Sequence, residues 1–401
     1  MDTLTSLRHE IDALWAGGKG KKLLAIALGW GLLNGIRMIY PVLLPSLSES
    51  FGLTLTTAGL LVTLIWITYA LGQVPGGVLA DRYGERTILT AGVVIVAVAV
   101  LLTVLASTTW SLFAATGLIG VGLSLYPVAR ITVLSELYPD RLGRVLGITM
   151  ATGDTGQTVL PLVAGVLIGL TWHVGLVFVV PLLIIVAITI RRVLPPTVSS
   201  DTANTELSAR RATYVLRKLY RPTLVITAIV LFLYIGVLQT FSAFYPTHLI
   251  NEKGFSSTTA SALFSLFFAF GIVAKPLAGI AYDVIGIRRS LPIVLSGASI
   301  GFGLLPFLDR FWLLAVDTVL ISTMLGSGAI TQSYLSETIP PEIEGTGLGA
   351  VRSSASLLAS MGPVLFGAIA ERGFFDEGYV SLALLMGVGT VLILRLPGEG
   401  N

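Results

Sequence analysis

Long apolar stretches, separated by short segments rich in charge, glycine or proline, follow one another along nearly the whole chain. No Asp, Glu, Lys or Arg occurs between Arg86 and Arg130, for example. About 20 mostly apolar residues suffice for one membrane-spanning helix, whereas strands of a membrane barrel would alternate polar and apolar residues over about 10 positions. The pattern therefore predicts an all-α membrane protein. Twelve spanning helices are expected, at residues 23–45, 55–80, 87–107, 109–136, 143–169, 173–194, 222–248, 257–282, 290–308, 311–337, 346–370 and 378–396.

The composition supports this interpretation. Hydrophobic residues make up 54% of the 401 positions, and only 12% are Asp, Glu, Lys or Arg, which is about half the charged fraction of a typical soluble domain. The chain contains no cysteine, so a secreted scaffold held by disulfides is excluded. A soluble enzyme, a collagen-like fibre and a disordered chain are excluded too, because none of them carries so large an apolar fraction.

The basic residues lie mainly on one side of the predicted membrane. With the N-terminus placed inside, 18 of the 25 Lys and Arg fall in inner segments, 3 in outer loops and 4 within spans. Cytoplasmic loops are enriched in Lys and Arg, so both termini are expected in the cytoplasm of a plasma-membrane protein. The net charge of +3 follows from this topology and gives no reason to expect nucleic-acid binding. About 20 hydrophilic residues precede the first span, so no cleavable signal peptide is expected.

Two segments are predicted to lie on the cytoplasmic membrane surface. Residues 1–22 place leucine and isoleucine at helical spacing, which is typical of an interfacial amphipathic helix. Residues 195–221 begin as a polar linker and end as a basic surface helix. This linker is expected to tether two six-helix bundles, at residues 23–194 and 222–401.

An internal repeat relates these two bundles. Asp81 recurs as Asp283 (283 − 81 = 202), and Gly165 recurs as Gly367 at the same shift, with further glycine and proline matches at shifts of 201 or 202. Six spans return the chain to the same side of the membrane, so the two halves share one orientation. Parallel repeats with a binding site at their interface are an architecture of secondary transporters.

The segment after the second predicted span carries a family resemblance. Residues 77–86 read Gly-Val-Leu-Ala-Asp-Arg-Tyr-Gly-Glu-Arg, which resembles the G-x-L-A-D-R-x-G-R-K motif of the major facilitator superfamily, and a degenerate copy occupies residues 279–289. The resemblance covers nearly the whole chain. It implies the family's twelve-helix fold and a secondary transporter. The chain departs from the motif at Glu85, which replaces a basic residue.

The resemblance also implies a gate on the cytoplasmic side. The motif aspartate would lie near the start of the eleventh span, and a motif arginine would pair with Glu136 or Asp140. Pro161 and Pro363 are predicted to interrupt the fifth and eleventh helices, where a kink helps a gate to bend. The residues expected in this gate are Gly77, Asp81, Arg82, Gly84, Arg86, Asp283 and Arg288.

Charged residues inside the predicted spans are the first candidates for a site, because a charge buried in a bilayer is costly and defaults to a functional role. They are Arg37, Arg130, Asp154, Lys275, Asp317 and Arg352. In the family, the first, fourth, seventh and tenth helices line the central cavity. With polar neighbours included, the residues expected to contact substrate are Arg37, Tyr40, Tyr126, Arg130, Gln157, Gln239 and Gln332.

The two deep arginines indicate the charge of the substrate. Arg37 and Arg130 suit a carboxylate or phosphate, since a guanidinium group can bind a planar oxyanion through two hydrogen bonds. In a second interpretation, the arginines neutralise Asp154 or Glu136 and do not touch substrate. Under either interpretation Asp154 is expected to carry a proton, with Glu136 as a second proton-coupling candidate. A substrate anion that competed for the arginine would then link its own binding to protonation.

These features favour a secondary transporter for a small organic anion, coupled to protons. The alternative is a drug/proton antiporter, because Gly153, Gly156, Pro161 and Gly165 partly resemble the fifth-helix motif of family exporters, although Leu160 stands where that motif has glycine. No motif supports an enzyme, and no segment is large enough for a receptor's aqueous domain. The expected partners are a small-molecule substrate, protons and the lipid bilayer. We expect a monomer with no cofactor, no metal and no bound nucleic acid.

Overall fold

The computed structural model describes residues 14–15, 18–196, 214 and 217–396. Within these residues the secondary structure is helical, without a strand. The predicted amphipathic segment at residues 1–22 and the linker at residues 195–221 lie mostly outside the described residues, so both stay predictions.

The helices fall into two sets, separated by the linker. We call α2 to α9 the N-terminal half and α11 to α18 the C-terminal half. The helices of the N-terminal half are α2 (Lys19–Phe51), α3 (Leu55–Tyr83), α4 (Glu85–Val104), α5 (Thr109–Ser124), α6 (Tyr126–Leu137), α7 (Leu142–Leu167), α8 (Trp172–Val177) and α9 (Val179–Val193). Those of the C-terminal half are α11 (Pro222–Asn251), α12 (Ser257–Ile285), α13 (Ile287–Leu304), α14 (Phe311–Ser322), α15 (Ser327–Thr338), α16 (Glu344–Ala359), α17 (Gly362–Ala370) and α18 (Phe375–Leu394).

The helices confirm an all-α membrane protein. Eleven candidate spans in the described part of the chain are long and apolar enough to cross a membrane. The remaining long helix, α7, has 26 residues and includes Arg144 and Asp154, which lower its apolar character. Twelve spans and cytoplasmic termini are consistent with this arrangement and remain predictions.

Matching local signals begin and end helices in the two halves. The side chains of Thr54 and Ser256 accept hydrogen bonds from backbone N–H groups in the first turns of α3 and α12, as N-cap residues do. Gly84 and Gly286, at φ 80° and φ 68°, end these two helices and begin the next. Glycine is required there because a side chain disfavours positive φ. The repeat seen in the sequence is therefore also a repeat of helix boundaries.

Four predicted spans are interrupted helices. The sixth breaks at Phe178, between α8 and α9. The fourth breaks at Leu125, and the tenth passes through a 3-10 turn at Thr323–Gly326. The eleventh breaks just before Gly362-Pro363, so the predicted interruption at Pro363 is confirmed. The prediction was wrong for Pro161, because α7 continues through it. A bundle can satisfy the carbonyl that a proline frees through neighbouring helices and side chains.

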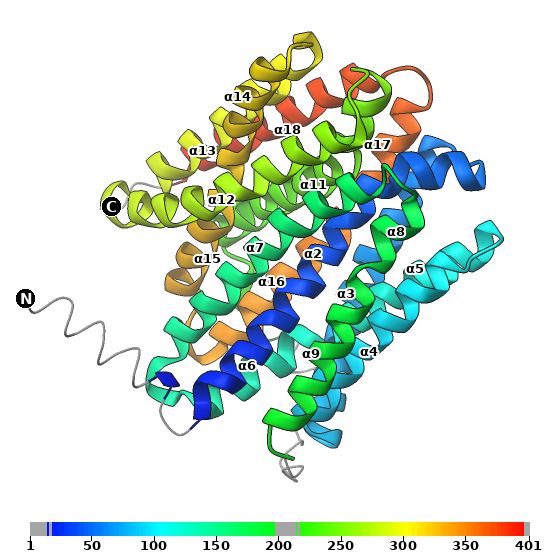
Figure 1. Cartoon of the computed structure of the whole chain (residues 1–401). Helices are drawn as coiled ribbons and strands as arrows, with labels where there is room; N and C mark the ends of the chain where they lie inside the picture. Colours follow the sequence, from blue (N-terminus) through cyan, green and yellow to red (C-terminus); the bar gives the residue numbers. More distant parts are fainter. Residues whose placement is uncertain (1–13, 16–17, 197–213, 215–216, 397–401) are drawn as a thin grey trace, which may run out of the picture.

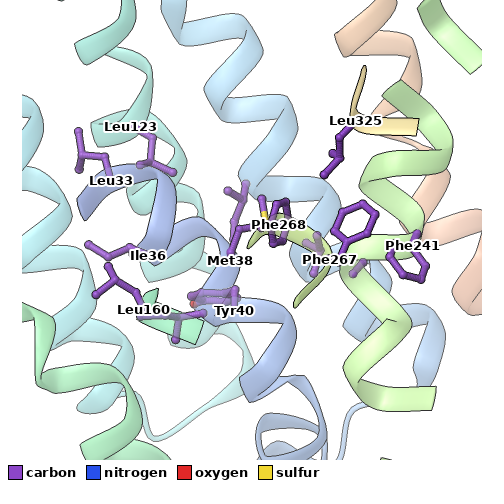
Figure 2. Packing of buried hydrophobic residues seen from close by; sticks show 14 of the residues in the cluster. Leu33, Ile36, Met38, Tyr40, Leu123, Leu160, Phe241, Phe267, Phe268 and Leu325 are labelled. Atoms are coloured by element: carbon purple, nitrogen blue, oxygen red, sulfur yellow. The ribbon is translucent and has the colours of Figure 1, made fainter. Parts of the chain in front are cut away.

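The two halves lie side by side (Figure 1), with α4 and α5 on one flank and α13, α14 and α18 on the other. Between them, α7 packs on α12, and α3 packs on α16 and α17. Each half has its own apolar interior. Figure 2 shows Leu33, Ile36 and Leu160 gathered in the N-terminal half, and Phe241 and Phe267 in the C-terminal half.

The halves approach each other closely at one end of the molecule. We call the end with the Thr54 and Ser256 caps the outer end, following the predicted topology, and the opposite end the inner end. A Cβ atom at Gly59 of α3 would collide with the carbonyl oxygen of Pro363, and one at Gly165 of α7 would collide with the hydroxyl of Ser261. Only glycine permits such contact between helices. The outer end is therefore closed.

The inner end is open. A Cβ added at Gly143 or Gly147, near the start of α7, would meet no atom within 4 Å. The same holds for Gly345 and Gly349, the repeat positions near the start of α16. The close packing seen at the outer end is therefore absent at these four glycines of the inner end.

Candidate functional site

Arg37 lies midway along α2 and is surrounded by neutral groups. Its Nη2 donates to Oδ1 of Asn34 at 2.8 Å. The guanidinium carbon lies 4.3 Å from the centre of the Trp66 ring and 5.4 Å from that of Tyr69, both on α3. These rings attract the cation through their electron-rich faces and leave its charge without a counter-ion.

Arg130, on α6, has a similar environment. Its Nη1 donates to the hydroxyl of Thr149 on α7 at 2.9 Å, and its guanidinium carbon lies 3.9 Å from the centre of the Trp30 ring. The side chain is buried, with 4% exposed. An aromatic face and a neutral hydroxyl again stand where a carboxylate would be expected beside a buried cation.

One face of α2 joins the two arginines. Trp30, Asn34 and Arg37 are spaced i, i+4 and i+7, which places them along one side of a helix, and Nδ2 of Asn34 donates to the carbonyl oxygen of Trp30 at 2.8 Å. Arg130 faces the Trp30 ring and Arg37 bonds to Asn34, so each arginine contacts this helix face. The structure therefore brings the two predicted arginines into one cluster.

A small cavity lies beside Arg37, between α2, α3 and α11. Its volume of about 10 Å³ is close to what one water molecule needs, and it is lined by Arg37, Trp66, Gln239 and Ser242, together with apolar side chains. Gln239 and Ser242 are only 1% and 2% exposed. The Gln239 amide atoms, the Ser242 hydroxyl and the Arg37 Nε have no hydrogen-bond partner among the described residues. Buried polar groups are nearly always paired, so these unpaired atoms are suited to a bound water or to one polar atom of a ligand.

Asp154 forms an ion pair across the interface of the halves. Nζ of Lys275, on α12, lies 2.6 Å from Oδ1 of Asp154, on α7. Nε2 of Gln157 is 3.4 Å from the same oxygen. The sequence singled out both charges, but the expectation that an arginine neutralises Asp154 is corrected by this contact. The partner is a lysine of the other half.

The C-terminal half carries a counterpart of the Arg130 contact. Nη1 of Arg352, on α16, donates to Oε1 of Gln332, on α15, at 2.8 Å. Gln332 is the repeat position of Arg130 (332 − 130 = 202). The cation thus comes from the fourth span in one half and from the eleventh in the other. In both halves its partner is neutral.

The two tyrosines expected at the site do not offer their hydroxyl groups to it, although the Tyr126 ring stacks on Trp30 with centroids 6.3 Å apart. Tyr40 is fully buried and shares a 2.6 Å hydrogen bond with Thr116. Tyr126 is fully buried too, and its hydroxyl donates to the carbonyl oxygen of Ile26 at 2.9 Å. Both hydroxyls are used inside the N-terminal half, so we leave these tyrosines out of the proposed site. In an apolar bundle the sequence does not distinguish a core tyrosine from one that faces a cavity.

The expected gate residues lie at the inner end, with Gly77 in the second-last turn of α3. Asp81 is exposed there, and its expected partner region at Gly345 has open space around it. Whether Asp81, Arg82 and Asp283 act as a gate stays a prediction.

Among the described residues, two motif arginines form hydrogen bonds within their own halves and not between the halves. Arg86 donates to the carbonyl oxygen of Leu194 at 3.4 Å, and Arg288, its repeat position, donates to that of Leu394 at 3.1 Å. Glu136 and Arg86 line a small inner-end cavity. Asp154 lies 12 residues into α7 (154 − 142), about 18 Å along the helix axis. Glu136 is therefore far from Asp154, although it lies on α6 six residues (136 − 130), or about 9 Å, beyond Arg130.

Sequence reasoning missed the aromatic and neutral members of the site, namely Trp30, Trp66, Tyr69, Thr149 and Ser242. A spacing signal was available for Trp30, which shares a helix face with Arg37. The other four come from α3, α7 and α11, and their approach to the arginines depends on how the helices pack.

Two repeated helical halves, with a charged and polar site between them, define the architecture of a secondary transporter. The chain belongs to the Major Facilitator Superfamily, whose profile matches residues 26–256 and 227–400. It is therefore a multi-pass membrane transporter and not an enzyme.

Several known proteins are similar over most of their length. The hexuronate transporter of Bacillus subtilis is 22% identical, with 91% of this chain and 92% of that protein covered. The cis,cis-muconate transport protein of Acinetobacter baylyi is 25% identical, with 86% of each chain covered. The aspyridones efflux protein of Emericella nidulans is 26% identical, with 81% of this chain and 67% of that protein covered.

A solved structure has the same fold. The inward-facing, occupied structure of a bacterial homologue of the human lysosomal transporter Spinster superposes with a TM-score of 0.78 at 16% identity, covering 92% of this chain and 95% of that one.

Proposed function

We propose that this transporter moves a small organic anion across the plasma membrane by alternating access, coupled to protons. In this proposal Arg37 and Arg130 bind the anion, and Gln239 and Ser242 bind a second polar group of the same molecule. Asp154 carries the proton.

The single observation that carries the proposal is the neutral environment of the arginines. Arg37, Arg130 and Arg352 contact Asn34, Thr149 and Gln332 respectively. Among the described residues no carboxylate lies within ion-pair distance of these three arginines. Arg130 is buried and Arg37 is half-buried, whereas Arg352 is exposed. A cation removed from water is costly unless an anion pairs with it, so this cost falls on Arg37 and Arg130. A substrate carboxylate supplies that partner.

The relatives support the same charge. Hexuronate and cis,cis-muconate, which name two of the similar proteins, are carboxylates. The open inner end and closed outer end represent one of the two states that alternating access requires. In this state the substrate exchanges with the cytoplasm under the predicted topology.

Uptake into proteoliposomes tests the proposal. The purified protein is expected to accumulate radiolabelled glucuronate or cis,cis-muconate when a pH gradient, acidic outside, is imposed. Arg37→Gln should reduce the initial rate about 10- to 100-fold, because a charge-assisted hydrogen bond is worth roughly 1.5–3 kcal/mol. Arg310→Gln, which removes an exposed arginine at the outer end, is the matched control and should leave the rate unchanged.

The drug/proton antiporter is the alternative outcome of this experiment. If the protein expels ethidium against a pH gradient and moves neither carboxylate, the anion proposal is wrong and efflux is supported. If Arg37→Gln transports the carboxylates at the wild-type rate, Arg37 is not a substrate ligand.

A further inference from the structure

The Asp154–Lys275 ion pair has no counterpart at the matching interface of the two halves. The repeat position of Asp154 is Ser356 (154 + 202), and that of Lys275 is Gln73 (275 − 202). The α3–α16 interface, which corresponds to α7–α12, therefore has neutral residues at both positions. Packing between the halves does not by itself require an ion pair at this depth.

Lys275 also differs from the other cations of the spans. Each of the three arginines has a neutral hydrogen-bond partner, whereas the ammonium group of Lys275 contacts a carboxylate at 2.6 Å. Its side chain is 34% exposed, while that of Asp154 is 15% exposed. The ammonium group is therefore within reach of an incoming anion and is already occupied by an internal one.

The protonation state of Asp154 sets the net charge of the charged residues inside the spans. Other polar and charged residues lie on helices that pack against the pair. Arg37 is on α2 and Arg130 on α6, which both pack on α7, and Tyr234 is on α11, which packs on α12. With Asp154 ionised, the four in-span cations and this carboxylate sum to +3 (4 − 1). With Asp154 protonated, the sum is +4 and Lys275 has lost its partner.

We propose that Lys275 binds the substrate anion. While Asp154 is ionised, its carboxylate pairs with the Lys275 ammonium group and blocks that binding. When Asp154 is protonated, the ammonium group is released and can bind the anion. This assignment rests on the proposed function. A proton that enters from solution binds a carboxylate oxygen of Asp154. The Lys275 ammonium keeps its own proton and transfers its ion pair to the carboxylate of the substrate. When the proton leaves, the Asp154 carboxylate recovers the ammonium group and the anion is released.

Thermodynamic reciprocity sets the direction of coupling. If protonation of Asp154 strengthens anion binding, anion binding strengthens protonation by the same factor. Proton and anion then bind and leave together, which is symport. The ion pair joins α7 to α12, so its exchange changes a contact between the halves that must move past each other.

Affinity measurements on two variants test this assignment. Binding of glucuronate and cis,cis-muconate to purified full-length protein is measured by calorimetry at about pH 8 and about pH 5.5. Asp154→Asn, which imitates the protonated acid, should bind about tenfold more tightly than wild type at the higher pH and lose its pH dependence. Lys275→Gln should bind about tenfold more weakly at the lower pH, and Lys275→Arg should recover much of the loss. Tenfold corresponds to about 1.4 kcal/mol.

The two variants are expected to change anion affinity in opposite directions, and this distinguishes a substrate ligand from an ion pair that only stabilises the structure. Both variants break the same ion pair, so a merely structural pair would change affinity in the same direction in both. That outcome would overturn the role of Lys275 and leave the proposed function standing. If wild type and Asp154→Asn bind neither anion at either pH, the proposed function fails and this assignment fails with it. Unfolding temperatures measured without anion show that each variant is folded, and Asp154→Asn/Lys275→Gln completes the double-mutant cycle.

Discussion

Glu371, at the end of α17 in the C-terminal half, accepts hydrogen bonds from Thr56 in the first turn of α3 in the N-terminal half. The backbone N–H of Thr56 lies 3.0 Å from Oε2 of Glu371, and the Thr56 hydroxyl donates to the same oxygen. The repeat position of Glu371 is Gly169 (371 − 202), so the second interface lacks this carboxylate. At the outer end, Glu371 therefore links the halves at the α3–α17 interface, and the α7–α12 interface has no equivalent carboxylate.

The Glu371 contact should make opening of the outer end sensitive to acid. Hydrogen bonds from the side chains of Thr56 and Thr54, and from the backbone of Thr56, lower the pKa of Glu371. Its contribution to closure is thus fully present above the ordinary glutamate pKa, about 4.3, and is lost as the pH falls through the lowered pKa. Glu371→Gln should open the outer end at any pH.

Cysteine labelling measures this opening, since the chain has no native cysteine. Ala243, buried at the small cavity beside Arg37, is replaced by Cys and treated with a membrane-impermeant maleimide from the outer side. Labelling should be faster in Glu371→Gln and faster in acid for the parent protein. Glu377→Gln, at an exposed carboxylate in the first turn of α18, is the control. Equal rates in all three proteins would show that the contact does not hold the outer end closed.

Gly59→Ala should prevent the outer end from closing. The added methyl group would collide with the backbone of Pro363 and Val364, and backbone atoms cannot move aside as a flexible side chain can. The transporter would stay open to the outside, so Ala243→Cys labelling should rise while uptake falls by about tenfold or more, a loss of about 1.4 kcal/mol. Gly303→Ala is the matched control, because its methyl group would meet no atom within 4 Å. Wild-type uptake by Gly59→Ala would contradict the close approach of α3 and α17.

The fold could be predicted from the sequence because it follows from local patterns and from the repeat. Apolar length predicted the spans, and the shift of 202 predicted matching elements, such as Gly84 and Gly286, which end α3 and α12. The break before Pro363 was also predicted. The continuity of α7 through Pro161 was not, because it depends on how neighbouring helices satisfy the freed carbonyl.

The candidate site was only partly predictable. In-span charge identified Arg37, Arg130, Asp154 and Lys275 as unusual residues. Their partners could not be inferred, because they come from other helices. The contact between Asp154 and Lys275 spans 121 positions of the chain, and no periodicity links residues so far apart.

Trp30→Ala should weaken anion binding although Trp30 carries no charge. Its ring faces the Arg130 guanidinium at 3.9 Å, and a cation–π contact of about 0.5–2 kcal/mol holds that group in position. Affinity for glucuronate or cis,cis-muconate should fall about 2- to 30-fold by calorimetry, and Trp30→Phe should retain most of it. Trp312→Ala, at a 77% exposed ring on α14, should have no effect. Weak binding by Trp30→Phe as well would indicate that the indole N–H, and not the ring face, is needed.

Asp317→Asn should stabilise the protein without changing transport. Asp317 lies on α14 in the C-terminal half, is 3% exposed, and neither carboxyl oxygen has a hydrogen-bond partner among the described residues. A buried polar group left unpaired costs about 1–3 kcal/mol, and an ionised one costs more. The neutral amide should therefore raise the unfolding temperature, and by a larger amount at alkaline pH, where a carboxyl group is more fully ionised.

A matched control is Asp309→Asn, which removes an exposed carboxylate paired with Lys253 at 2.9 Å and should change stability by at most about 1 kcal/mol. Because Asp317 is enclosed within the C-terminal half and Asp154 lies at the interface of the halves, uptake driven by a pH gradient should survive Asp317→Asn and be lost in Asp154→Asn. If both variants are folded, and uptake is lost in Asp317→Asn but survives in Asp154→Asn, then Asp317 and not Asp154 carries the proton.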